Sequence, residues 1–101
     1  METEYQKLLL VFRIGNADRV TEIATSAAKA LKLFCRNIQP AFTSKHGETF
    51  GLLLDTEEPP HIVIATLFRK AGLSNDDFVI ATELTHAEAR GNNIVESWLN
   101  I

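Results

Sequence analysis

The sequence has one cysteine, no long apolar run and no surplus of positive charge, and each of these shortages excludes a class of protein. Cys35 has no second thiol with which to form an internal disulfide, so we expect a reducing, cytoplasmic environment. No apolar stretch approaches the ~20 residues that a membrane-spanning helix requires. A formal net charge of −3 supplies no general attraction to nucleic acid. These observations argue against membrane insertion and against a nucleic acid partner.

The chain also lacks low-complexity segments, internal repeats and any linker long enough to separate two domains. Its 101 residues are close to the commonest size of one domain, and 46% of them are hydrophobic, as in an ordinary globular protein. We therefore expect a single domain over residues 1–101, with enough apolar surface to form a core without disulfides.

The spacing of apolar residues predicts four strands and two helices. Strands are expected over residues 7–14, 35–43, 48–55 and 76–84. A helix over 18–34, capped by Asn16 or Asp18, has apolar residues every three or four positions. A second helix begins in the stretch TEEPP, residues 56–60, and stops at Gly72, with its buried face formed by Pro60, Ile64, Leu67, Phe68 and Ala71. Residues 61–68 also fit a strand, but the flanking prolines and the glycine favour a helix.

The predicted order β-α-β-β-α-β resembles the ferredoxin-like fold. That fold belongs to the α+β class and has a four-stranded antiparallel sheet in the order 4-1-3-2 with two helices on one face. The first and third strands, which are central in this order, are the most apolar. The second strand contains Pro40, which cannot donate to a ladder and so belongs at a sheet edge. Residues 94–99 add a short C-terminal helix or extension.

The first strand, KLLLVFRI, is apolar on both faces, so the sheet face away from the helices also needs a cover. Registers that join opposite charges pair Lys7 with Asp55 on the third strand and with Glu83 on the fourth, and Arg13 with Asp77. This face then has an apolar centre of Leu9, Val11, Leu53, Val79 and Ala81, and a charged border of Lys7, Arg13, Asp55, Asp77 and Glu83. Such a pattern is typical of a contact surface.

Two covers fit this face: a partner, or the chain's own C-terminal segment with Trp98 as its packing anchor. The partner is a second copy, another protein or a small ligand, and we expect a homodimer to which the C-terminal segment contributes. The predicted partner-binding residues are Leu9, Val11, Arg13, Leu53, Asp77, Val79 and Trp98.

No motif for a metal, a cofactor or catalysis stands out. The histidines are scattered and Cys35 has no catalytic partner in the pattern, so we predict no metal, no cofactor and no catalytic residue. The open-face positions of the two central strands carry no aromatic residue, and this argues against the base stacking of the RNA-recognition module.

An enzyme is the alternative interpretation. A small dimeric enzyme would have an apolar substrate pocket with Arg13 and His61 as polar groups. A nuclease would hold a metal ion on one of two carboxylate clusters, which are Asp55, Glu57 and Glu58, or Asp76 and Asp77. Both clusters lie where a helix start or a turn already favours acidic residues. The sequence therefore favours a small binding or regulatory module.

Overall fold

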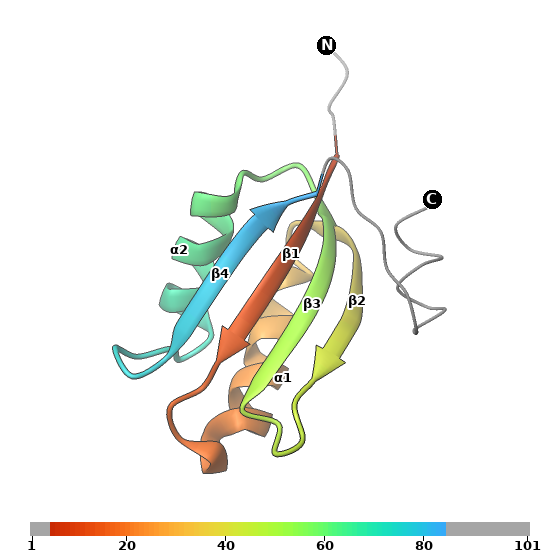
Figure 1. Ribbon diagram of the computed structural model, residues 1–101. Coiled ribbons are helices and arrows are strands. Elements are labelled where there is room, and N and C mark those ends of the chain that lie inside the picture. Colours follow the sequence, from red (N-terminus) through yellow and green to blue (C-terminus); the bar gives the residue numbers. More distant parts are fainter. Residues whose placement is uncertain (1–4, 85–101) are drawn as a thin grey trace.

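The computed structural model describes residues 5–84, which form four strands and two α-helices in the predicted order (Figure 1). These elements are β1 (Gln6–Arg13), α1 (Val20–Leu31), β2 (Cys35–Thr43), β3 (Thr49–Thr56), α2 (Pro60–Lys70) and β4 (Phe78–Glu83). A short 3-10 helix, η1 (Ala17–Arg19), precedes α1. Neither helix in this range has the length and apolar character needed to cross a membrane. The expected C-terminal helix at 94–99 lies outside the described residues.

The strands form one antiparallel sheet in the order β2-β3-β1-β4, and both helices lie on the same face of it (Figure 1). The α+β class and the strand order are therefore the expected ones and are compatible with a ferredoxin-like fold. β1 and β3 are central, while β2, which contains Pro40, is an edge strand as predicted.

The predicted register between β1 and β3 is confirmed, with Lys7 opposite Asp55 and Val11 opposite Gly51. The residues of β1 that alternate with these point to the helices, and Leu8, Leu10 and Phe12 are all 0% exposed. Phe12 stacks on its cross-strand partner Phe50, with 4.7 Å between ring centroids. The hydrophobic core therefore lies between the sheet and the helices.

The entry into α1 depends on Asn16, whose side-chain oxygen accepts a hydrogen bond from the N–H of Asp18 at 2.9 Å. α1 then buries Ile23, Ala27 and Leu31, which are one turn apart. It ends at Leu31 rather than at Phe34 as predicted. The carbonyl of Phe34 instead accepts a hydrogen bond from the Thr56 hydroxyl at 3.0 Å, as the chain enters β2 beside β3.

The buried face of α2 differs from the prediction. Leu67 and Ala71 are buried as predicted, but Val63 and Thr66 are buried as well, and Phe68 is 40% exposed. Apolar residues surround much of this helix, so their spacing alone does not fix its rotation. Thr66 tolerates burial because its hydroxyl donates to the carbonyl of Ile62 at 2.8 Å. Gly72 follows the helix with a φ of 77°, as expected for a terminating glycine.

Candidate interaction surface

The open face is the side of the sheet that points away from α1 and α2. Because directly opposed residues in an antiparallel ladder point to the same side, the register identifies its members. Alongside Lys7, Leu9, Val11 and Arg13 of β1, the open face includes Thr49, Gly51, Leu53 and Asp55 of β3. The edge strands contribute Phe78, Ile80 and Thr82 of β4, and Asn37, Gln39 and Phe42 of β2.

The prediction for β4 was wrong by one residue. Val11 lies opposite Ile80 and Arg13 opposite Phe78, so the expected pairs with Val79 and Asp77 do not form. A shift of one residue exchanges the two faces of a strand. Val79 and Ala81 consequently pack against the core, and Phe78 and Ile80 lie on the open face. Glu83 likewise lies on the helix-facing side, opposite Leu8, and not on the open face as predicted.

Asp77 is not on the open face, because its carboxylate joins two loops before β4 begins. One oxygen accepts from the N–H of Gly15 at 2.9 Å, and the other accepts from the N–H of Ser74 at 2.8 Å and forms an ion pair with Arg19 at 3.5 Å. Desolvation by burial acts to raise the pKa of Asp77, but the hydrogen bonds from Gly15 and Ser74 and the Arg19 charge lower it below its usual value. These contacts explain why the predicted pair with Arg13 does not form.

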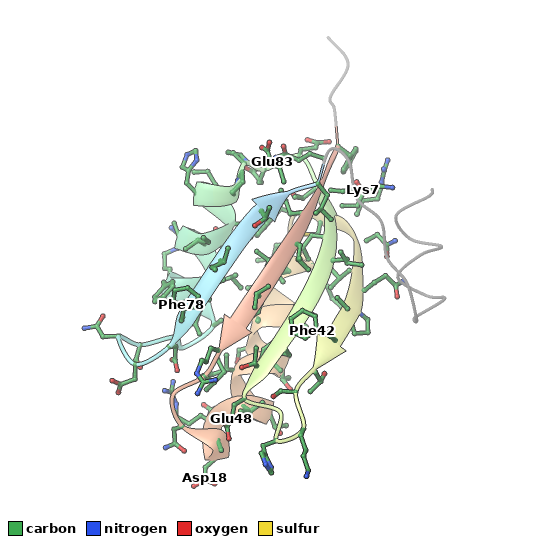
Figure 2. The ribbon with its side chains drawn as sticks, viewed as in Figure 1. Lys7, Asp18, Phe42, Glu48, Phe78 and Glu83 are labelled. Atoms are coloured by element: carbon green, nitrogen blue, oxygen red, sulfur yellow. The ribbon has the colours of Figure 1, made fainter. Side chains whose placement is uncertain are left out.

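Two exposed phenylalanines lie on the open face, and neither is among the contact residues predicted from the sequence (Figure 2). Phe78 is 54% exposed at the start of β4, and Phe42 is 45% exposed on β2 with its ring across Gly51 of β3. Ile80 is also 45% exposed. The central strands carry no aromatic residue on this face, as expected, so the aromatic side chains lie on the two edge strands. If Asp77 had been assigned to the buried side, the alternation of side chains along β4 would have placed its neighbour Phe78 on the open face.

The predicted centre of the surface is less accessible than its sides. Leu9 and Val11 are half-buried, and Leu53 is 2% exposed although it lies on the open face. Of the other predicted contact residues, Arg13 is exposed, and its guanidinium is 3.4 Å from the Thr49 hydroxyl. Trp98 lies outside the described residues. The accessible apolar groups are therefore those of Phe42, Phe78 and Ile80.

The other end of the open face is polar. Arg36, in a bulge of β2, donates to the Asp55 carboxylate from Nε at 3.0 Å and lies 3.9 Å above the Tyr5 ring. A hydrogen bond to Glu57 raises the pKa of the Tyr5 hydroxyl. Lys7 is the cross-strand neighbour of Asp55. Among the described residues, this face and its polar end thus carry three cations, Lys7, Arg13 and Arg36, and two carboxylates, Asp55 and Glu57, although the chain as a whole is acidic.

An open hollow of about 420 Å³ lies beside this polar end and includes Cys35 and Lys32 among its lining residues. Burial raises the pKa of the Cys35 thiol to about 11. A thiol is a poor nucleophile in that state, because the reactive species is the thiolate. Cys35 is therefore not an activated nucleophile.

The geometry does not bring the candidate catalytic groups together. Arg13 ends β1, whereas His61 lies just after the start of α2, which follows the opposite end of the sheet where Gln6 pairs with Thr56. Asp55 is held by Arg36 and Asp77 by the two loops. Within residues 5–84, no group of three or more histidine, cysteine or acidic side chains is placed to hold a metal ion.

Comparisons with known proteins add no functional information. No protein-family model and no curated protein matches the chain. A solved structure from Nitrosomonas europaea, described as a protein of unknown function, is similar to it with a TM-score of 0.47 and 13% sequence identity. The alignment covers 90% of this chain and 100% of the other. A likeness of this degree supports no argument about the site, so the functional interpretation depends on the geometry of the chain itself.

Proposed function

We propose that this chain is a small binding module with a ferredoxin-like fold, and that its open face binds a partner surface that is apolar and acidic. The observation that carries the proposal is the exposure of Phe42, Phe78 and Ile80 on one sheet face, on either side of Val11 and next to Arg13. Exposed apolar side chains gathered on one face, with charged residues beside them, are typical of interaction sites.

The charges of the open face favour an acidic partner over a second copy stacked on the same face. Arg13 lies at one end of this face, and Lys7 and Arg36 lie at the other, where Asp55 is already held by Arg36. Two sheets packed face to face keep their strands roughly aligned. Stacking like end on like end would place cations against cations, whereas a partner with carboxylates beside apolar groups would match both the surplus of cations and the exposed apolar side chains.

A titration with two synthetic peptides tests this proposal. Both are amphipathic helices with leucine and phenylalanine on one side, and they differ in having glutamate or lysine on the other. We expect the acidic peptide to shift the amide NMR signals of Val11, Arg13 and Ile80, and to bind at least five-fold more tightly than the basic one. Val11→Asp should abolish binding, while Leu33→Asp, which places the same charge at an exposed leucine outside the open face, should leave it unchanged. Equal binding of both peptides, or shifts confined to the helices, would contradict the proposal.

The chain's own C-terminal segment is the competing occupant, and Trp98 reports on it because it is the only tryptophan. If residues 94–99 covered the open face, Val11→Asp would shift the tryptophan fluorescence to longer wavelength without any peptide present. An unchanged spectrum, together with peptide binding by the unmodified chain, supports an external partner.

A further inference from the structure

The hollow beside the polar end of the open face is formed by three segments that are distant in the sequence. Tyr5 precedes β1, residues 32–36 lead from the end of α1 into β2, and residues 57–58 lead from β3 into α2. These segments meet at the end of the sheet where β1 begins (Figure 1). The volume of about 420 Å³ is within the range of small-molecule sites. The hollow is therefore large enough for a small organic ligand.

Thr56 joins the α1–β2 wall of this hollow, residues 32–36, to its β3–α2 wall, residues 57–58. Its hydroxyl donates to the carbonyl of Phe34 at 3.0 Å and accepts from the N–H of Glu58 at 3.2 Å. The side-chain amide of Gln6 also donates to the carbonyl of Glu58 at 2.7 Å. Thr56 itself is 0% exposed. The backbone of both walls is thus held in place before a ligand arrives, and this lowers the entropy cost of binding.

The two walls carry opposite charges. Lys32 and Arg36 line the α1–β2 wall, whereas Glu57 and Glu58 line the other. Arg36 and Glu57 already have the partners described above. Within residues 5–84, neither the Lys32 ammonium nor the Glu58 carboxylate forms a hydrogen bond or an ion pair, so the two do not meet across the hollow. The hollow therefore leaves one cation and one carboxylate available to a ligand.

A ligand with a single charge gains little from this arrangement. The lining side chains carry two positive and two negative charges, so attraction to one wall is offset by repulsion from the other. A molecule with both an ammonium and a carboxylate can place each group against the wall of opposite sign. Charge-assisted hydrogen bonds to Lys32 and Glu58 would then use both unpaired groups. The charges therefore favour a zwitterion.

The hollow also has an apolar part. Leu33 is 69% exposed, which is the highest value among the large hydrophobic residues in the described part of the chain. It lines the hollow next to the half-buried Phe34. An apolar group placed on Leu33 would remove this surface from water, which favours binding. An α-amino acid with an apolar side chain carries an ammonium, a carboxylate and an apolar group on one carbon, and so matches all three features.

We propose that this hollow binds a free α-amino acid with an apolar side chain. Lys32 binds the carboxylate, Glu58 binds the ammonium, and Leu33 contacts the side chain. The site is separate from the open face, because neither Lys32 nor Glu58 belongs to that face. The module would then have a small-molecule ligand in addition to the partner of its open face.

An NMR titration of the unmodified chain with leucine and two analogues tests the proposal. The analogues are 3-methylbutylamine, which is leucine without the carboxylate, and 4-methylpentanoate, which is leucine without the ammonium. We expect leucine to shift the amide signals of Leu33, Cys35 and Glu58 with a dissociation constant of about 1 mM or lower, and to bind roughly ten-fold more tightly than either analogue. No shift at these residues with leucine up to about 20 mM, or equal binding of all three compounds, would overturn the proposal.

Two variants that keep side-chain size test the assigned roles. Lys32→Met should weaken leucine binding roughly five-fold without weakening that of 3-methylbutylamine, because the amine has no carboxylate to lose. Glu58→Gln should weaken leucine binding by a similar factor without weakening that of 4-methylpentanoate. Lys45→Met and Glu22→Gln make the same changes at exposed positions outside the hollow and should have no effect. Unchanged leucine binding in both hollow variants, or equal weakening in the two controls, would overturn the proposal.

The leucine titration and the peptide titration report on different residues. Leucine should leave the amide signals of Val11 and Ile80 on the open face unchanged, and shifts confined to those residues would contradict the assignment of the hollow. Leucine binding tests the hollow and peptide binding tests the open face, so either proposal can fail without the other.

Discussion

The two faces of this sheet are built from alternate residues of the same strands, yet they have different surroundings. On the helix-facing side, Leu10 and Phe12 are fully buried beneath α1 and α2. One residue away, Leu9 and Val11 are half-buried, and their neighbours on β4 and β2 include side chains that are about half exposed. The same apolar residue types therefore stabilise the fold on one face and are available for contact on the other. Position in the pleat decides which role a residue has.

The largest expected difference between the faces is in how much unfolding free energy is lost when each of two adjacent leucines, Leu9 and Leu10, is replaced by alanine. Leu10→Ala leaves a cavity in a core position that is 0% exposed, so we expect a loss of about 2–5 kcal/mol. Leu9→Ala makes the same chemical change on the open face and should lose less than about 1.5 kcal/mol. Urea denaturation of both variants measures this. Equal losses would contradict the assignment of the two faces.

Asp77→Asn tests the carboxylate that holds the loops at the end of the core. In this variant the side-chain NH₂ group would face a backbone N–H that now donates to the carboxylate, so we expect the unfolding free energy to fall by about 1–3 kcal/mol at pH 7. The folded-state pKa of Asp77 lies below the usual value of 3.8, so this carboxylate stabilises the fold above that pH and the contribution disappears as the pH falls through the lowered pKa. Urea midpoints between pH 7 and pH 2 should therefore decrease more steeply for the unmodified chain than for Asp77→Asn. Parallel curves would contradict this role.

Two glycines allow a matched comparison of crowding near the core and on the open face. A Cβ at Gly15 would lie 2.5 Å from the backbone carbonyl oxygen of Asp76, which cannot move freely. We expect Gly15→Ala to lose about 1–3 kcal/mol of stability. The three atoms nearest to a Cβ at Gly51 all belong to the exposed ring of Phe42, which can rotate away. Gly51→Ala should therefore lose less than about 1 kcal/mol and shift the NMR signals of the Phe42 ring. The reverse order of stability losses would show that the Phe42 ring is held in place.

The smallest expected stability change belongs to Phe78→Ala. Because this ring is 54% exposed, its removal should change the unfolding free energy by no more than about 0.5 kcal/mol. Thermal unfolding compared with the unmodified chain measures the change. A loss above about 2 kcal/mol would show that Phe78 is covered by other parts of the chain.

The sequence was sufficient to predict the order of the elements, the central strands and the register of β1 with β3. Lys7 and Asp55 fixed that register because their charges and the apolar alternation agreed. The side-chain directions of β4 were harder to predict. Phe78 and Ile80 are apolar, and so are the alternating residues Val79 and Ala81, so the pattern did not show which pair points to the core. The charge of Asp77 suggested a partner on Arg13, but the backbone N–H groups of Gly15 and Ser74 bind that carboxylate instead. The prediction of the buried face of α2 was wrong for a related reason. Val63, Ile64, Leu67 and Phe68 are all apolar and lie on adjoining sides of the helix, so their spacing did not select one side.

The central claim is that the open face is a binding surface rather than a second core. Isothermal titration calorimetry of the acidic amphipathic peptide with the unmodified chain and with Phe78→Ala tests it most directly, provided that both unfold at the same temperature. We expect Phe78→Ala to bind at least ten-fold more weakly, which corresponds to about 1.4 kcal/mol. Equal dissociation constants for the two proteins, or no binding to either, would contradict the claim.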